Sequence, residues 1–156
     1  ENEGARELLD YLKESVGEGL SSVRFTSSLG NPPACLSTEG DISADMEKTL
    51  HLMYEGKLVS PWVSEQMVDI MKRCHTNSRI PRYLPKGTEV AHKTGTMDKV
   101  ANDVGVVYTD KGDYLLCMFY NVNTATREEY DANIKGRLSD NLLADISRDI
   151  YAEYVK

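Results

Sequence analysis

The most constraining feature of this sequence is an apolar run, Tyr114 to Tyr120, in which polar and apolar residues do not alternate. A strand of this kind is covered on both faces by other parts of a protein. The tetrapeptide Asp110-Lys111-Gly112-Asp113 precedes it and favours a tight turn after a strand expected over residues 103–109. With a further strand expected over residues 89–96, the pattern predicts a three-stranded antiparallel meander within residues 89–120.

Helical periodicity accounts for much of the remaining chain. Apolar residues recur at helical spacing in four segments: 3–16, 42–55, a segment that begins at Ser60-Pro61, and 138–155. Ser60 suits the N-cap and Pro61 the first turn of its helix. Residues 17–40 are rich in serine and glycine and contain a Pro-Pro pair, so we expect a long loop there.

The order of these elements indicates the α+β class, because the helices are segregated from an antiparallel sheet. A central strand that is buried on both faces also suggests that further strands and helices are missing from the chain. The helix that begins at Pro61 is expected to place an apolar stripe in the core, and Trp62 is expected there too. The stripe consists of Val63, Met67, Ile70, Met71 and Cys74.

Composition excludes several classes of protein. The 156 residues are 40% hydrophobic and 28% charged, which argues against a disordered chain. No apolar run approaches the roughly 18 residues of a membrane-spanning helix. The net charge of −7 comes without a basic stripe, so no nucleic-acid partner is expected. The three cysteines lack C-x-x-C spacing, so neither a zinc site nor a disulfide framework is indicated, while a single disulfide stays open.

Chemistry is concentrated in the segment Lys93-Thr94-Gly95-Thr96, at the end of the first expected meander strand. Lysine is a compact cation that can lie beneath a substrate carboxylate, and the Thr94 hydroxyl can donate to the same group. Gly95 allows a ligand to approach the strand edge closely. Thr96 can offer its backbone N–H to a developing oxyanion. His92 points to the opposite face and is expected to be a hydrogen-bonded core or surface histidine.

A Lys-Thr-Gly strand ahead of a hairpin resembles one signature of class A-like serine β-lactamases and penicillin-binding proteins. Three flanking segments resemble the same family: residues 54–60, Arg79-Ile80-Pro81 and Asn102-Asp103-Val104-Gly105. The resemblance implies a β-lactamase/transpeptidase-like fold and acyl transfer to a serine. It implies catalytic or substrate-binding roles for Lys93, Thr94, Gly95 and Thr96. A β-lactam or a peptidoglycan stem peptide would be the ligand, with no cofactor or metal, in a secreted, periplasmic or cell-surface protein.

The catalytic set of that family is incomplete in this sequence. No serine is followed three residues later by lysine, so the family's Ser-x-x-Lys nucleophile is absent. We therefore expect the C-terminal portion of a larger enzyme, inactive alone, with residues 1–75 in a helical domain and 76–156 in an α/β domain. The missing N-terminal half or a second copy would then be a partner.

The second family motif, Ser-Asp-Asn, has two candidates here. Ser139-Asp140-Asn141 spells it literally but follows the Lys-Thr-Gly strand, so we interpret Ser139 or Asp140 as the N-cap of the closing helix. Asn2 resembles the last residue of the motif and would contact the substrate, or it is simply part of a frayed helix start.

The family's Glu-x-x-Leu-Asn loop, which positions the deacylating water, has no match in this sequence. Its absence favours one alternative to a β-lactamase, a D-Ala-D-Ala peptidase. A separate alternative is a non-catalytic binding module that keeps the strand as scaffold.

Overall fold

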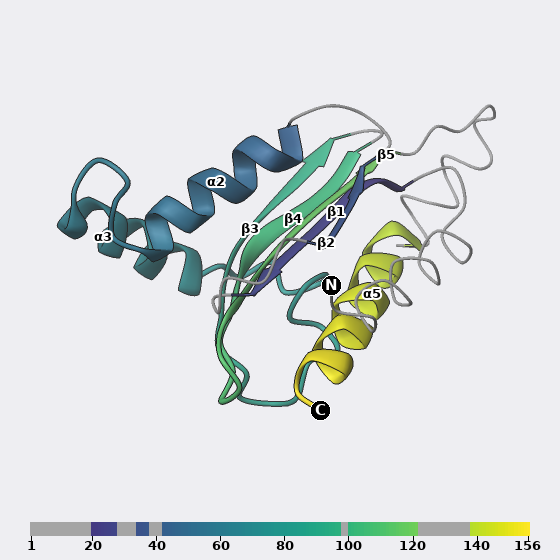
Figure 1. The fold of residues 1–156 in the computed structure, drawn as a ribbon. Helices are drawn as coiled ribbons and strands as arrows, with labels where there is room; N and C mark the ends of the chain where they lie inside the picture. Colours follow the sequence, from purple (N-terminus) through teal and green to yellow (C-terminus); the bar gives the residue numbers. More distant parts are fainter. Residues whose placement is uncertain (1–19, 28–33, 38–41, 98–99, 122–137) are drawn as a thin grey trace.

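The computed structural model describes residues 20–27, 34–37, 42–97, 100–121 and 138–156. Within these residues, three helices lie on the two faces of a five-stranded sheet, and the α+β class is confirmed (Figure 1). The predicted helix over residues 3–16 lies outside the described residues. No helix in the described ranges is both long and apolar enough to cross a bilayer.

The predicted meander is present and forms one side of the sheet. It consists of β3 (Val90–Met97), β4 (Val100–Val107) and β5 (Tyr114–Asn121), each antiparallel to its neighbour. The predicted turn between β4 and β5 is closed by the Thr109 hydroxyl, which donates to the Gly112 carbonyl at 2.6 Å. The strand order β2-β1-β5-β4-β3 leaves β3, with the Lys-Thr-Gly segment, at an edge.

The expectation of a long loop over residues 17–40 is wrong. This segment contains β1 (Leu20–Ser27) and β2 (Ala34–Ser37), and β1 pairs with β5 along its length. In β1, the apolar residues Val23 and Phe25 alternate with polar ones, which is the strand pattern. The serines around them conceal this alternation, and pairing with the buried strand β5 stabilises the extended backbone.

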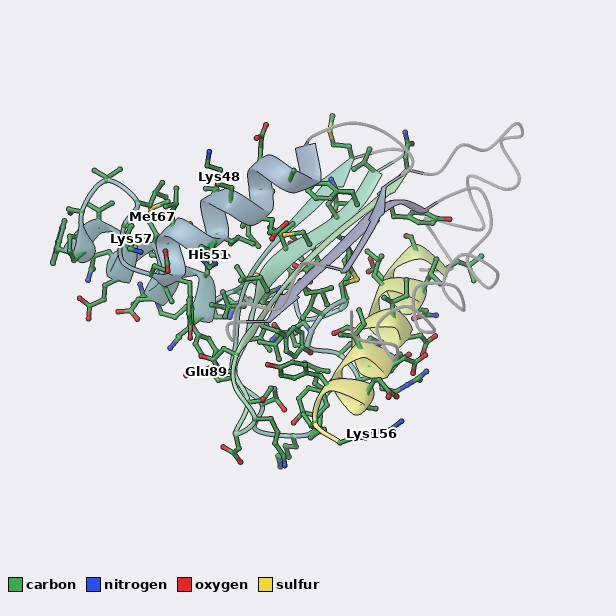
Figure 2. All side chains as sticks on the ribbon, in the orientation of Figure 1. Lys48, His51, Lys57, Met67, Glu89 and Lys156 are labelled. Carbon is green, nitrogen blue, oxygen red and sulfur yellow. The ribbon has the colours of Figure 1, made fainter. Side chains whose placement is uncertain are left out.

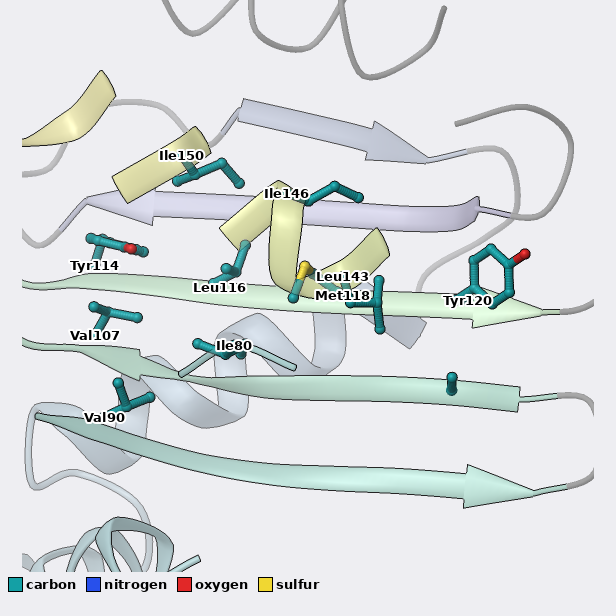
Figure 3. Close-up of a cluster of buried hydrophobic side chains, with 11 residues drawn as sticks. Ile80, Val90, Val107, Tyr114, Leu116, Met118, Tyr120, Leu143, Ile146 and Ile150 are labelled. Atoms are coloured by element: carbon teal, nitrogen blue, oxygen red, sulfur yellow. The ribbon is translucent and has the colours of Figure 1, made fainter. Parts of the chain in front are cut away.

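Strand β5 is buried from both sides, as its sequence predicts. The helix α5 (Leu138–Tyr154) covers one face, and α2 (Ile42–Tyr54) and α3 (Pro61–Lys72) lie on the other (Figure 1). Alternate β5 residues enter two separate apolar clusters. The α5-side cluster includes Leu116, Met118, Leu143 and Ile146 (Figure 3), and the α2-side cluster includes Leu50, Met53, Leu115 and Cys117.

The expected core face of α3 is partly wrong. Trp62 is 68% exposed and Ile70 is 62% exposed, and Met67 is exposed as well. Helix α3 instead turns Ser64, Val68 and Met71 inward, at spacings of four and three residues. The apolar residues of this helix outnumber the positions on one face, so periodicity alone does not identify the buried stripe.

The predicted start of α3 is confirmed. Ser60 is the N-cap, with extended backbone, and its hydroxyl accepts the Val63 N–H at 3.2 Å. We expect Ser60→Ala to lower the free energy of unfolding by about 1 kcal/mol, because the Val63 N–H then loses its acceptor. Urea denaturation measures this loss. Ser60→Asp should keep most of the stability, and an unchanged Ser60→Ala variant would contradict the role of the cap.

The C-terminal end of α3 is fixed to the start of β3. The Lys72 ammonium lies 2.8 Å from a carboxylate oxygen of Glu89 and 4.4 Å from the centre of the Tyr108 ring. Glu89 immediately precedes β3 (Figure 2). Burial raises the pKa of Tyr108 to about 12, and nearby carboxylates add to the shift. These contacts place α3 against the strand that carries Lys93.

Candidate functional site

The segment Lys93-Thr94-Gly95-Thr96 lies in the second half of the edge strand β3. Because side chains alternate along a strand, Lys93 shares the face of Ala91, which belongs to the α2-side cluster. Thr94 and Thr96 share the other face with His92. Lys93 is exposed, and its ammonium donates to the carbonyl of Thr94.

Arg79, which the sequence did not assign to the site, donates side-chain hydrogen bonds to this segment. Its side chain is only 3% exposed, and its guanidinium bridges three elements. Nη1 donates to the carbonyls of Gly95 at 3.0 Å and Asn102 at 2.6 Å. Nη2 donates to the Thr96 hydroxyl at 2.7 Å, and Nε donates to the Asp140 carboxylate at 2.6 Å. Arg79 therefore connects the end of β3 to the first turn of α5.

The contact with Asp140 corrects the interpretation of Ser139-Asp140-Asn141. Helix α5 already includes Leu138, so Ser139 and Asp140 lie within its first turn and not at the N-cap. Asp140 is an ion-pair partner of Arg79, and the Asn141 amide oxygen accepts a hydrogen bond from Arg82 at 2.5 Å. A carboxylate in the first turn also interacts favourably with the helix dipole.

A polar cleft of about 460 Å³ opens beside this ion pair. Its walls come from the segment after α3, the ends of β3 and β4, and the first turn of α5. The lining residues are His75, Thr76, Asn77, Ser78, Arg79, Thr96, Val100, Ala101, Ser139 and Asp140. Of the predicted site residues, Thr96 lines the cleft, whereas Lys93 and Thr94 do not. Asn2 lies outside the described residues.

His92 is a buried, hydrogen-bonded histidine, as expected. Its Nδ1 lies 2.9 and 3.1 Å from the two carboxylate oxygens of Asp103, and its Nε2 lies 3.1 Å from the Asn77 amide oxygen. His92 is 1% exposed and Asp103 is fully buried. Within the described part of the chain, no group of three histidine, cysteine or carboxylate side chains is placed to hold a metal ion.

The chain matches a known protein family. A model of the Beta-lactamase enzyme family matches residues 19–154, which is most of the chain. The chain belongs to the β-lactamase enzyme family. The expected resemblance and the β-lactamase/transpeptidase-like fold are thereby confirmed.

Solved structures of β-lactamase relatives have the same fold. PBP-A is 27% identical with a TM-score of 0.57, covering 70% of this chain and 38% of PBP-A. A β-lactamase from Sphaerobacter thermophilus is 22% identical with a TM-score of 0.58, covering 79% of this chain and 42% of that enzyme. The chain thus spans about two fifths of the length of these structures.

A curated relative matches over a shorter stretch. The chaperone protein HtpG of Clostridium perfringens is 45% identical over 53 residues, which are 34% of this chain and 8% of the chaperone. The family match extends over far more of this chain than the local similarity to the chaperone does.

Proposed function

We propose that the protein is a serine β-lactamase-like hydrolase that acts by acyl transfer, and that this chain binds the carboxylate of the substrate. Membership of the β-lactamase family supports the reaction class. The hydrogen bond from Arg79 to the Thr96 hydroxyl supports the binding role. A hydroxyl that accepts a hydrogen bond still has its own proton to donate, so Thr96 can donate to an anion in the cleft.

The cations near the edge of β3 give this site its preference for an anion. Lys93 and Arg79 belong to different elements, and both contact the Lys-Thr-Gly segment, through the carbonyls of Thr94 and Gly95 respectively. Asp140 offsets the charge of Arg79 at Nε, while the Nη atoms face β3 and β4. In this proposal, the carboxylate lies at the open edge of β3, where Lys93 on one face and Thr94 and Thr96 on the other can reach it. Gly95 allows close approach, and the Thr96 N–H stabilises the oxyanion.

The nucleophilic serine in this proposal comes from polypeptide outside this sequence, because the 156 residues contain no Ser-x-x-Lys. Residues 76–156 would contribute to the α/β domain of the whole enzyme, together with β1 and β2, which lie in the same sheet. The missing half is then a partner of this chain. We further propose that the whole protein works outside the cytoplasm, as a secreted, periplasmic or cell-surface enzyme.

Mass spectrometry of the intact chain after incubation with benzylpenicillin tests the assignment of the nucleophile. We expect the mass to stay unchanged, because no activated serine is present in the chain. A stoichiometric adduct of benzylpenicillin would contradict the proposal and would identify a nucleophile within these residues.

A D-Ala-D-Ala peptidase is the second candidate. The absence of a Glu-x-x-Leu-Asn motif favours it, because an acyl-enzyme without a positioned base is hydrolysed slowly. The similarity to PBP-A, a variant of which has been solved as an acyl-enzyme complex with penicillin G, is compatible with either reaction. Turnover of benzylpenicillin compared with a stem-peptide mimic by the whole protein distinguishes the two. Faster turnover of the peptide would identify the peptidase.

A further inference from the structure

The segment that carries Arg79 is held on both sides of that residue by buried polar groups. On one side, Asn77 lies 3.1 Å from Nε2 of His92. On the other side, the Ile80 N–H donates to the Asp103 carboxylate at 3.0 Å, and the Ile80 carbonyl accepts from the Ser147 hydroxyl at 2.9 Å. The backbone position of Arg79 is therefore set by contacts that do not involve its own side chain.

His92 and Asp103 form the centre of this arrangement. Nδ1 of His92 faces both carboxylate oxygens of Asp103, so a proton on Nδ1 lies between the ring and an acceptor. The pair joins adjacent strands, and each member extends to the Arg79 segment: His92 to Asn77, and Asp103 to Ile80.

We propose that His92 and Asp103 are positioning residues, which fix the Arg79 segment so that the guanidinium meets the edge of β3. An arginine side chain has several rotatable bonds and loses rotamer entropy when it is ordered. The Arg79 guanidinium makes four hydrogen bonds, described above. They form together only when the Cα atom of Arg79 lies within a fraction of an ångström of one position. The inference deepens the proposed function and rests on it in one respect: the Thr96 hydroxyl that Arg79 contacts is the one assigned to the substrate carboxylate.

The decisive variant is Asn77→Ala in the full 156-residue chain. Asn77 is exposed, so the variant should fold, and it removes the contact of the segment with His92. We expect hydrogen exchange of the Arg79 Nε–H, followed by ¹⁵N NMR, to become about tenfold faster, as for the loss of one hydrogen bond. His92→Ala should accelerate exchange further if that variant folds.

Ser64→Ala is the matched control. Ser64 is fully buried and hydrogen-bonded to the backbone of Leu58, but it lies in α3, away from Arg79. The control should leave the exchange of Arg79 Nε–H unchanged even if it lowers the thermal midpoint. If His92 has only a structural role, exchange of the Arg79 Nε–H should become faster in every variant whose thermal midpoint falls, including Ser64→Ala. That result would overturn the proposal.

Benzylpenicillin separates failure of this inference from failure of the proposed function. We expect Asn77→Ala to bind benzylpenicillin severalfold more weakly than the unmodified chain, but because Asn77 also lines the cleft, exchange of the Arg79 Nε–H is the measurement that reports positioning. If the unmodified chain does not bind while Arg79 exchange still responds to Asn77→Ala, the carboxylate site is wrong and the positioning role stands. If it binds and exchange does not respond, the positioning role is wrong and the proposed function stands.

Discussion

Gly105→Ala is expected to prevent β3 from pairing correctly with β4. Gly105 lies opposite His92 in the register of the two strands. A methyl group at Gly105 would lie 2.4 Å from the Ala91 carbonyl oxygen, 2.7 Å from His92 Cβ and 2.9 Å from His92 Cα. Most of these are backbone atoms of a paired strand, which cannot rotate away as the end of a side chain can. We therefore expect a loss of more than about 3 kcal/mol in the free energy of unfolding, or no soluble protein.

Gly95→Ala is the matched control for that variant. Gly95 lies in the same pair of strands, but an added methyl group would meet only the Asn102 side chain, at 3.7 and 3.9 Å. Its free energy of unfolding, measured with urea, should change by less than about 1 kcal/mol. Equal stabilities for the two variants would contradict the close approach of β4 to His92.

Arg79→Met is expected to destabilise the chain by about 3 kcal/mol or more. The variant leaves the Asp140 carboxylate, whose side chain is 17% exposed, without its cation. It also removes the donor to the carbonyls of Gly95 and Asn102. A partly buried carboxylate that loses its partner costs several kcal/mol, because its desolvation is no longer compensated. Urea denaturation of the variant measures the loss.

Arg82→Met and a double-mutant cycle serve as controls for this prediction. Arg82 lies three residues further along and bonds Asn141 on the same helix, but it is exposed, so its loss should cost under about 0.5 kcal/mol. Asp140→Asn should cost less in the Arg79→Met background than alone, because the two residues form one interaction. Additive effects of the two substitutions would show that the ion pair contributes little.

Sequence patterns correctly predicted the elements whose structure depends mainly on residues next to one another in the chain. The apolar run from Tyr114 to Tyr120 predicted a strand buried on both faces, and Ser60-Pro61 predicted the start of α3. Strand β1 was missed because its serines resemble a loop and because it is stabilised by pairing with β5, about ninety residues away in the sequence. The exposed position of Trp62 depends on which side of α3 meets the sheet, which a helical period does not specify.

The candidate site was predicted only in part, for a related reason. Lys93-Thr94-Gly95-Thr96 is continuous in the sequence and was recognisable as a motif. Arg79 belonged only to a segment that resembles the family, because its partners lie 16 to 61 residues away and no spacing rule connects them. An arginine just before a hydrophobic residue and proline, followed by a short edge strand, was the only signal that could have indicated it.

The central claim is that the edge of β3 binds an anionic acyl donor. Titration of the ¹⁵N-labelled chain with benzylpenicillin, followed by NMR, tests that claim directly. The account predicts weak, saturable shifts at the amides of Lys93 to Thr96 and at the Arg79 side chain, which Lys93→Ala diminishes and Lys86→Ala does not. Shifts located elsewhere, or a response that is the same in Lys93→Ala, would contradict it.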